Sequence, residues 1–268
     1  MDGGRNRIGD MRLRDRKAFI TGASRGIGRA VALAYAKEGA VIALGARSME
    51  PLERVAAEID GAGGRAVPIA IDVGSSESIE KAHAEVTAKL GDIQILVNNA
   101  GIAKSVKVLD MDDEHWQSHL DINLTSVFKI TRAFLPELVA QKWGRVINIA
   151  STAGKVGFRY TAAYCASKHG VIGFTRALAL EMATLGVTVN AICPGFVNTD
   201  MASEAARNIA AKTGGSEEEA RKWLAKLSPQ NRLMEPEEVA SVAVMLATDA
   251  SRGINGQAIN IDGGAVVY

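Results

Sequence analysis

The chain has 268 residues, of which 47% are hydrophobic and 23% are charged, a composition typical of a globular protein with a sizeable core. Its 31 basic and 30 acidic residues leave a net charge of +1, which gives no electrostatic reason to expect a nucleic-acid partner. No stretch approaches the ~20 apolar residues of a membrane span, so we expect a soluble, cytoplasmic protein that binds neither nucleic acid nor membrane. Basic residues cluster near the start without a long apolar run behind them, and we interpret residues 1–14 as a flexible tail.

Short apolar runs alternate with amphipathic segments from residue 17 to the end. Strands that are apolar on both faces and separated by helices predict a parallel sheet covered by helices on each side. Residues 15–268 are therefore expected to form a single α/β domain, a Rossmann-like doubly wound sheet of about seven strands. The strands are predicted at 18–21, 41–44, 66–71, 94–98, 145–150, 187–192 and 258–261. The helices are predicted at about 27–38, 50–60, 76–90, 112–120, 125–141 and 162–185, with a last helix from Pro236.

The longest interruption of this alternation, about residues 196–235, follows the sixth strand. It contains a helix pattern at 216–223, in which acidic and basic side chains are spaced four residues apart. Open α/β sheets bind ligands at the carboxyl ends of their strands, so we interpret this segment as a substrate lid.

A glycine-rich turn, Thr21-Gly-Ala-Ser-Arg-Gly-Ile-Gly28, connects the first strand to the first helix. Gly22 permits a tight turn, Gly26 allows close approach of a pyrophosphate, and Gly28 lets helix and strand pack closely. The exposed N–H groups at the start of the helix then face the phosphates. An ordinary strand-to-helix turn is the alternative, but the position after the first strand favours dinucleotide binding.

The end of the second strand indicates which dinucleotide is bound. NAD sites carry an acidic residue there for the ribose hydroxyls, yet no acid occurs between Glu38 and Glu50. Arg47 follows this strand, and Arg25 lies in the glycine turn beside the same pocket. Guanidinium groups bind phosphate through a planar fork, so a 2′-phosphate is favoured, and with it NADP(H) over NAD(H). Both arginines being ordinary surface residues is the alternative.

Tyr164 and Lys168 are one helical turn apart, so their side chains share a face. Ser151 directly follows the fifth strand, at the carboxyl edge where a nicotinamide would lie. A carbonyl reduction needs a proton donor for the developing alkoxide, and a nearby ammonium lowers the pKa of a tyrosine from its ordinary value of about 10. Ser151 is placed to hydrogen-bond the substrate oxygen beside Tyr164.

At this point the chain is identified as resembling the short-chain dehydrogenase/reductase family over residues 12–268. No single motif is specific, but their joint occurrence in this order is. The matching motifs are Thr21-Gly-x-x-x-Gly-x-Gly28, Asp72, Asn98-Asn-Ala-Gly101, Asn123, Ser151, Tyr164-x-x-x-Lys168 and Pro194-Gly195.

The resemblance implies a role for each motif. Tyr164 would be the general acid/base, Ser151 would orient the carbonyl, and Lys168 would bind the nicotinamide ribose and lower the tyrosine pKa. Asn123 would hold a water that links Lys168 to solvent. The cofactor contacts would be Gly22, Ser24, Arg25, Gly26, Ile27, Gly28, Arg47, Asp72, Val73, Asn99, Ala100, Gly101, Tyr164, Lys168, Pro194, Gly195, Val197 and Thr199.

Local runs such as Ile149-Ala-Ser-Thr-Ala-Gly-Lys155 are similar to 3-oxoacyl-thioester reductases and aromatic polyketide ketoreductases. The segment Ile102-Ala-Lys-Ser-Val106 lacks the glycine-rich continuation of the polyketide enzymes. The resemblance therefore implies NADPH-dependent reduction of a ketone, with a 3-oxoacyl thioester or related oxo compound as substrate, by a homotetramer.

Two other functions stay open: an NAD-dependent secondary-alcohol dehydrogenase, and a non-catalytic dinucleotide-sensing protein. The intact catalytic set argues against the second. His115 and His119 are spaced i,i+4 among acidic residues, but a metal site needs a third ligand, and none is expected. Ser151 with His169 does not form a hydrolase, because its surroundings do not match a nucleophile elbow.

Overall fold

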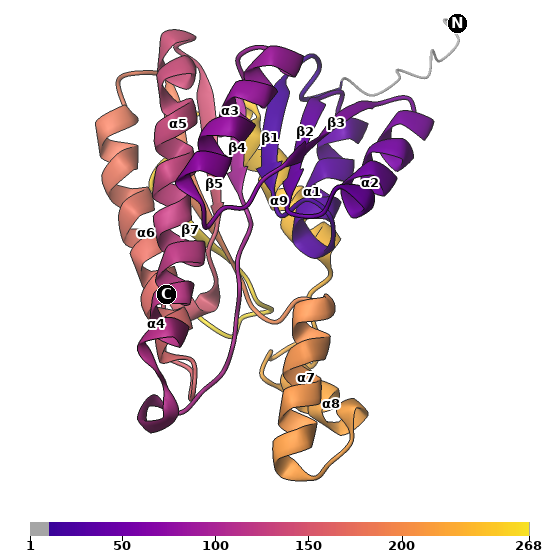
Figure 1. The fold of residues 1–268 in the computed structure, drawn as a ribbon, viewed down its shortest axis with the longest axis vertical. Coiled ribbons are helices and arrows are strands. Elements are labelled where there is room, and N and C mark those ends of the chain that lie inside the picture. The colour runs from indigo at the N-terminus through magenta and orange to yellow at the C-terminus, as the bar shows by residue number, and fades with distance from the viewer. Residues whose placement is uncertain (1–10, 268) are drawn as a thin grey trace, which may run out of the picture.

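The computed structural model describes residues 11–267, and residues 1–10 of the predicted tail lie outside this range. Seven parallel strands form one sheet in the order β3-β2-β1-β4-β5-β6-β7, which confirms the predicted doubly wound fold (Figure 1). The strands are β1 (Lys17–Thr21), β2 (Val41–Ala46), β3 (Arg65–Ala70), β4 (Ile95–Asn98), β5 (Gly144–Ile149), β6 (Val187–Pro194) and β7 (Ala258–Ile261).

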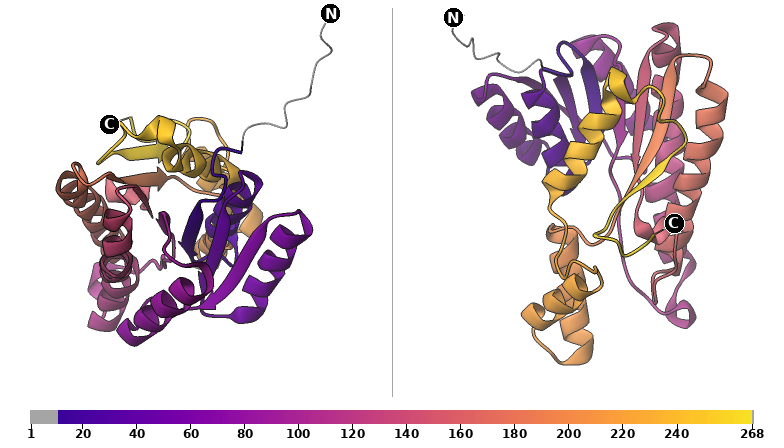
Figure 2. Two further views of the ribbon diagram at one scale, coloured as in Figure 1. Left: turned by 90° about the horizontal axis from the view of Figure 1, so that it is seen from above. Right: turned by 180° about the vertical axis from the view of Figure 1, so that it is seen from behind.

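Helices cover both faces of the sheet (Figure 2). On one face α1 (Gly26–Lys37), α2 (Met49–Gly61) and α9 (Pro236–Ala247) pack into one apolar cluster with the sheet. On the other face lie α3 (Ser76–Leu90), α5 (Ser126–Ala140) and α6 (Ala162–Met182). Among the described residues, no helix is long and apolar enough to cross a membrane.

Alternation along β1 shows why these strands are apolar throughout. Ala18 and Ile20 belong to the cluster with α1 and α9, whereas Phe19 between them packs against Phe134 of α5, with ring centroids 5.0 Å apart. A strand buried on both faces must supply apolar side chains to each, because successive side chains point in opposite directions.

Three features differ from the expectations. The two helices predicted at 112–120 and 125–141 are joined without a loop, because a π-helical turn, η2 (Asp121–Thr125), connects α4 (Asp113–Leu120) to α5. The segment after β6 contains α7 (Asp200–Thr213) in addition to the predicted helix, α8 (Glu217–Lys226). Residues 11–14, expected in the tail, pack on the domain: Leu13 is 1% exposed and its N–H donates to Glu38 O at 2.9 Å.

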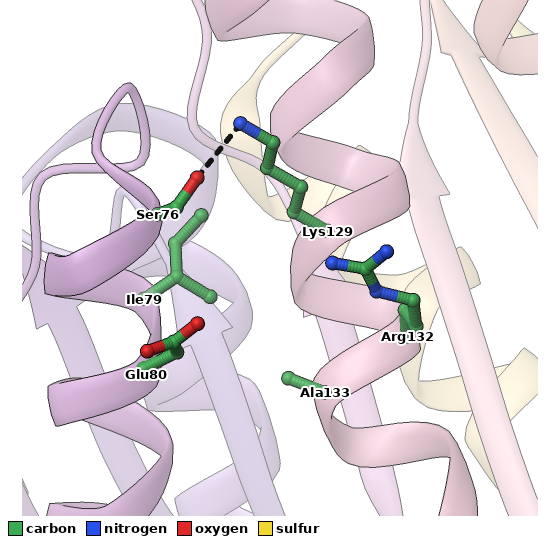
Figure 3. Close-up of a pocket in the computed structure, with 6 residues that line it drawn as sticks. All are labelled: Ser76, Ile79, Glu80, Lys129, Arg132 and Ala133. Carbon is green, nitrogen blue, oxygen red and sulfur yellow. Dashed lines mark hydrogen bonds between the residues drawn. The ribbon is translucent and has the colours of Figure 1, made fainter.

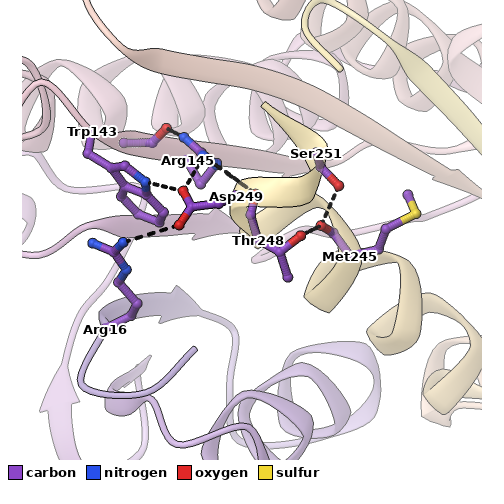
Figure 4. A network of polar contacts seen from close by, with 8 residues as sticks. Arg16, Trp143, Arg145, Met245, Thr248, Asp249 and Ser251 are labelled. Atoms are coloured by element: carbon purple, nitrogen blue, oxygen red, sulfur yellow. Dashed lines mark hydrogen bonds and ion pairs between the residues drawn. The ribbon is translucent and has the colours of Figure 1, made fainter. Parts of the chain in front are cut away.

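A polar cluster ties the amino ends of the strands together (Figure 4). The guanidinium groups of Arg16 and Arg145 lie 3.7 and 4.2 Å from the ring centroid of Trp143. Asp249, after α9, accepts from the Trp143 indole at 2.6 Å and pairs with Arg145 at 3.4 Å and Arg16 at 3.7 Å. This cluster lies at the end of β5 opposite to Ser151.

Candidate active site

The carboxyl ends of the parallel strands lie at one edge of the sheet. Most of the predicted site residues follow the ends of β1 to β6, whereas Asn123 lies on η2, and Tyr164 and Lys168 lie on α6. β1 and β4 are neighbours although β2 and β3 lie between them in sequence, so the chain switches direction across the sheet there. Such a switch point opens a crevice between the loops of the two halves.

The glycine turn has the conformation that its sequence predicts. Gly22 and Gly26 have φ of +66° and +54°, a region that side chains disfavour. A Cβ on Gly28 would lie 2.2 Å from Gly22 O, so only glycine fits. No side chain caps the first turn of α1, which begins at Gly26, so its N–H groups are available to an anion, and Ser24 and Ile27 flank them.

Thr21 and Asn99 brace this turn from β1 and β4. The Thr21 hydroxyl accepts from the backbone N–H of Asn99 at 3.0 Å and of Ala100 at 3.1 Å. The Asn99 amide donates to Thr21 O at 2.9 Å and Gly22 O at 3.1 Å. Thr21 and Asn99 both belong to the family motifs, but the bracing role of the Thr21 hydroxyl is visible only in the structure.

The residues predicted at the adenosine end are exposed or partly buried. Arg47 is exposed directly after β2, and Arg25 forms an ion pair with Asp200 of α7 at 3.3 Å. Asp72 is exposed after β3, where its carboxylate accepts from Gly74 N–H at 3.0 Å, and Val73 packs partly buried beside it. No carboxylate follows β2 before Glu50, so Arg47 and Arg25 are the charged groups next to the end of β2.

Ser151 and Tyr164 meet at the carboxyl end of β5. The Ser151 oxygen accepts from Ala153 N–H at 3.1 Å, which fixes its position after the strand. Burial raises the pKa of Tyr164, and the hydrogen bond with Ser151 partly offsets this. The net direction is opposite to the lowering expected from a neighbouring ammonium, because removing the phenolate from water costs more than its partners return.

Lys168 lies one turn further along α6 and is 5% exposed. Its Nζ donates to Ile149 O at 2.8 Å and lies 5.8 Å from the centroid of the Tyr164 ring. Burial lowers the pKa of Lys168 to about 8. An ammonium with this pKa can give up and regain a proton near neutral pH.

Asn123 lies in the π-helical turn η2 and is fully buried. Its amide forms a closed pair with the backbone of Ile102: Oδ1 accepts from Ile102 N–H at 2.8 Å, and Nδ2 donates to Ile102 O at 2.9 Å. A Cβ on Gly101 would lie 3.0 Å from Asn123 Oδ1 and 3.8 Å from Lys168 Nζ. The structure therefore brings Gly101, which the resemblance implied on the adenosine side, together with Asn123 and Lys168.

The residues predicted at the nicotinamide end follow β6. Pro194 ends the strand, and Gly195 N–H donates to Ile261 O at 2.9 Å. Val197 forms a bridge with Met234, and Thr199 packs against Gly26 of the glycine turn, since a Cβ there would lie 3.2 Å from Thr199 Cγ2. The base of the predicted lid thus lies against the phosphate-binding turn.

Ser167 contributes to the cluster, although no sequence motif selects it. This fully buried hydroxyl donates to Tyr164 O at 2.8 Å and accepts from Asn123 Nδ2 at 3.1 Å. It connects the helix of Tyr164 to the π-helical turn. Its position one residue before Lys168 was visible, but only the packing of α6 on η2 shows its partners.

Other hollows lie away from this cluster. One is on the outer surface between α3 and α5, where Lys129 Nζ donates to Ser76 Oγ at 2.9 Å (Figure 3). This hollow is lined by Ser76, Ile79, Glu80, Lys129, Arg132 and Ala133. A second hollow lies between α5 and α6 and is lined by Phe128, Phe174 and other side chains.

The family model of the short chain dehydrogenases matches residues 16–210. The chain is 42% identical to a 3-oxoacyl-[acyl-carrier-protein] reductase of Synechocystis, over 94% of this chain and 97% of that protein. It is 41% identical to the monensin polyketide synthase putative ketoacyl reductase of Streptomyces virginiae, over 93% and 96%. A crystal structure of an actinorhodin polyketide ketoreductase variant with NADPH has a TM-score of 0.92 and 38% identity, covering 95% of this chain and 98% of that one. These similarities confirm the resemblance, and the protein belongs to the short-chain dehydrogenase family, whose members are oxidoreductases.

Proposed function

We propose that the protein reduces a ketone to a secondary alcohol with NADPH, and that Tyr164 is the proton donor. The observation that carries this proposal is the contact of Tyr164 with Ser151 at the carboxyl end of β5, with Lys168 buried beside it. A hydroxyl that holds its proton, a second hydroxyl and a cation form the set that carbonyl reduction needs.

Each side chain has a distinct task in this proposal. NADPH, when bound, supplies the hydride for the carbonyl carbon. Ser151, whose oxygen is fixed by Ala153 N–H, donates a hydrogen bond to the carbonyl oxygen. Tyr164 transfers its phenolic proton to the alkoxide, and Lys168 returns a proton to the phenolate. Asn123 positions a water that reconnects Lys168 with solvent. The raised pKa of Tyr164 keeps the phenol protonated, so it carries the proton that the alkoxide takes up.

The glycine turn and the basic end of the crevice are the proposed dinucleotide site. The positive φ of Gly22 and Gly26 and the uncapped start of α1 form a cradle for the pyrophosphate. Arg25 and Arg47 would bind a 2′-phosphate, and Asp72 and Val73 would border the adenine. Asn99, Ala100 and Gly101 would line the adenosine side, and Pro194, Gly195, Val197 and Thr199 the nicotinamide. The NADPH complex of the similar ketoreductase structure supports NADP(H) as the cofactor.

A 3-oxoacyl thioester is the proposed substrate class, because the similar proteins are named as 3-oxoacyl-[acyl-carrier-protein] and ketoacyl reductases. We propose residues 196–235 as the lid over it. α7 and α8 pack on each other through Ala206, Ala220 and Leu224 and project beyond the sheet (Figure 1). Met201 and Trp223 are exposed apolar side chains on these helices that a substrate chain would cover.

A homotetramer in the cytoplasm is part of the proposal. Phe128 on α5 and Leu180 on α6 are exposed apolar side chains on one helix-covered face, which suits a contact between copies. Light scattering of the purified protein tests the assembly, and cell fractionation tests the location.

The direct test follows NADPH consumption with 3-oxoacyl thioesters, cyclic ketones, sugars and steroids, in the wild type and in Tyr164→Phe. We expect thioester reduction, and a loss of about 10²–10⁴-fold in kcat for Tyr164→Phe. Tyr160→Phe is the matched control, since it removes an exposed phenol four residues earlier. Unchanged turnover in Tyr164→Phe would contradict the mechanism, and a preference for NAD⁺ with secondary alcohols would make the protein an alcohol dehydrogenase.

A further inference from the structure

The segment Ile102–Val106, which directly follows the Asn-Asn-Ala-Gly motif, is held by three sets of hydrogen bonds. Ile102 pairs with Asn123 through both backbone groups. Lys104 N–H donates to His119 Nε2 at 3.1 Å, and Val106 N–H donates to Tyr160 O at 2.8 Å. The segment thus joins α4 and η2 to the loop that enters the helix of Tyr164.

His119 is the central attachment, and it is 0% exposed. Its Nδ1 lies 2.8 Å from His115 O, and a carbonyl oxygen only accepts, so Nδ1 carries the proton. Nε2 must then be the bare nitrogen that accepts from Lys104 N–H. Only the neutral Nδ1–H tautomer satisfies both contacts. Both ring nitrogens of His119 contact backbone groups, so neither has a lone pair directed at a metal.

Protonation of His119 would turn Nε2 into a donor that faces the Lys104 N–H donor. The Lys104 N–H would then lose its acceptor, and the hydrogen bond that holds the segment to α4 would break. The surroundings oppose the charge. The ring of His115 is stacked on His119, with centroids 4.6 Å apart, and the ammonium of Lys104 repels a protonated His119.

We propose that neutral His119 is a positioning residue that locks segment 102–106 as a wall of the substrate opening. Its protonation releases this wall, so ketone binding weakens in acid while dinucleotide binding does not. The kinetic part rests on the proposed ketoreductase function. The tautomer and the hold on the segment rest on the hydrogen bonds alone.

The pH range of the release follows from the groups around the ring. Burial, and to a smaller degree His115 and Lys104, lower the pKa of His119 from 6.5, while the hydrogen bond to His115 O raises it. On α6, which packs against α4, the polar contacts of Lys168 and His169 run to Ile149 O and Cys165 O. The other titratable side chains in the first turns of α6 are Tyr164 and Cys165. The neutral form thus persists down to below pH 6.5.

Three variants separate positioning from general stability. His119→Gln keeps a side-chain acceptor and cannot be protonated. His119→Met keeps the bulk without the acceptor. Lys104→Gln keeps the backbone donor and removes a cation that lowers the His119 pKa in addition to burial and His115. His83→Gln on α3 is the matched control, because the pKa of His83 is also lowered by burial and its ring lies against Phe134 instead.

The experiment measures kcat and both KM values across the range around pH 6.5, and amide hydrogen exchange of residues 102–106 without substrate. For the wild type and His83→Gln, we expect the ketone KM to rise several-fold in acid, with the NADPH KM constant. His119→Gln should abolish this rise, His119→Met should show the high KM and fast exchange at every pH, and Lys104→Gln should move the rise to higher pH.

A rise of the ketone KM in acid that persists in His119→Gln would overturn the proposal. An Nε2–H tautomer of His119 in ¹⁵N NMR would also overturn it. So would exchange of residues 102–106 that is the same in wild type and His119→Met. Should His119→Met fail to fold, Lys104→Gln still tests the proposal, because a rise of the ketone KM that does not move to higher pH in this variant would contradict it. Absence of reduction with every ketone would refute the proposed function, whereas the exchange and tautomer results test the lock independently of it.

Discussion

The guanidinium of Arg25 lies 3.3 Å from the carboxylate of Asp200, so an ion pair joins the glycine turn to the first turn of α7. Both side chains are exposed, and such a pair contributes only about 0–1 kcal/mol. A 2′-phosphate can therefore displace the carboxylate from Arg25 at little cost. Asp200 is then a competitor for the arginine that is proposed to select NADPH.

Removing Arg25 should weaken NADPH binding, whereas removing the charge of Asp200 should strengthen it. Arg25→Ala is expected to raise the KM for NADPH about tenfold or more, because a charge-assisted contact to phosphate is lost. Asp200→Asn should lower it a few-fold, since Arg25 is then no longer paired. The KM for NADH, which lacks the 2′-phosphate, is the internal control and should hardly move in either variant. Equal effects on both dinucleotides would contradict the assignment of Arg25.

Gly28→Ala should disrupt the phosphate-binding turn. The added Cβ would lie 2.2 Å from Gly22 O and 2.5 Å from Asn99 Nδ2, and a clash with backbone cannot be relieved by a side-chain rotation. We expect a loss of about 1–3 kcal/mol in the free energy of unfolding and weaker NADPH binding. Gly61→Ala at the end of α2, where nothing lies within 4 Å, should be neutral or stabilising. Urea denaturation and a fluorescence titration with NADPH measure both quantities.

Lys168→Met should stabilise the fold while it reduces activity. Burial lowers the pKa of Lys168 from 10.5 to about 8, so the unfolded chain binds the proton more tightly than the folded protein. The folded state is therefore most favoured above pH 10.5 and loses stability as the pH falls from 10.5 to about 8, below which the loss is complete. At neutral pH the variant should gain on the order of 1–3 kcal/mol.

The stability gain of Lys168→Met should vanish toward pH 10.5, where the lysine is neutral in both states. Urea denaturation at neutral and at high pH measures this difference. Lys226→Met, an exposed lysine on α8, serves as the control and should show no such pH dependence. A gain that is independent of pH would mean that packing, and not the buried charge, is responsible.

Asp249→Asn should lower stability without changing catalysis. Arg145 is 3% exposed, its pKa is lowered by burial, and Asp249 is the carboxylate that offsets its charge. Asparagine still accepts from the Trp143 indole, but Arg145 and Arg16 lose their counter-charge (Figure 4). We expect a loss of about 1–3 kcal/mol in thermal or urea unfolding, with kcat unchanged.

The exposed Lys81–Glu77 pair is the comparison for this prediction. Glu77→Gln breaks an i,i+4 ion pair on the surface of α3 and should cost less than about 0.5 kcal/mol. A similar small effect for Asp249→Asn would show that the Trp143 ring and the backbone carbonyls of Gly144 and Thr248 hold the arginines without this carboxylate.

The sequence by itself determined the seven strands and most of the helices in their chain order, and the face that Tyr164 and Lys168 share. These are local properties: apolar runs such as 187–192 predict strands, and a spacing of four residues predicts a common helix face. The glycine turn belongs to the same class, because the φ of Gly22 and Gly26 follows from the tight turn between β1 and α1.

Tertiary structure alone decided which distant groups meet. Leu13 is buried in the apolar cluster of α1, α2 and α9, and its N–H donates to Glu38 O. Nothing in residues 1–14 predicts these contacts. The raised pKa of Tyr164 and the lowered pKa of Lys168 come from burial, which the i,i+4 spacing does not contain. His119 looked like half of a metal site, yet its partner is a backbone N–H fifteen residues earlier in the chain. Local patterns specify elements, whereas desolvation and hydrogen bonds between elements arise only when the sheet brings them together.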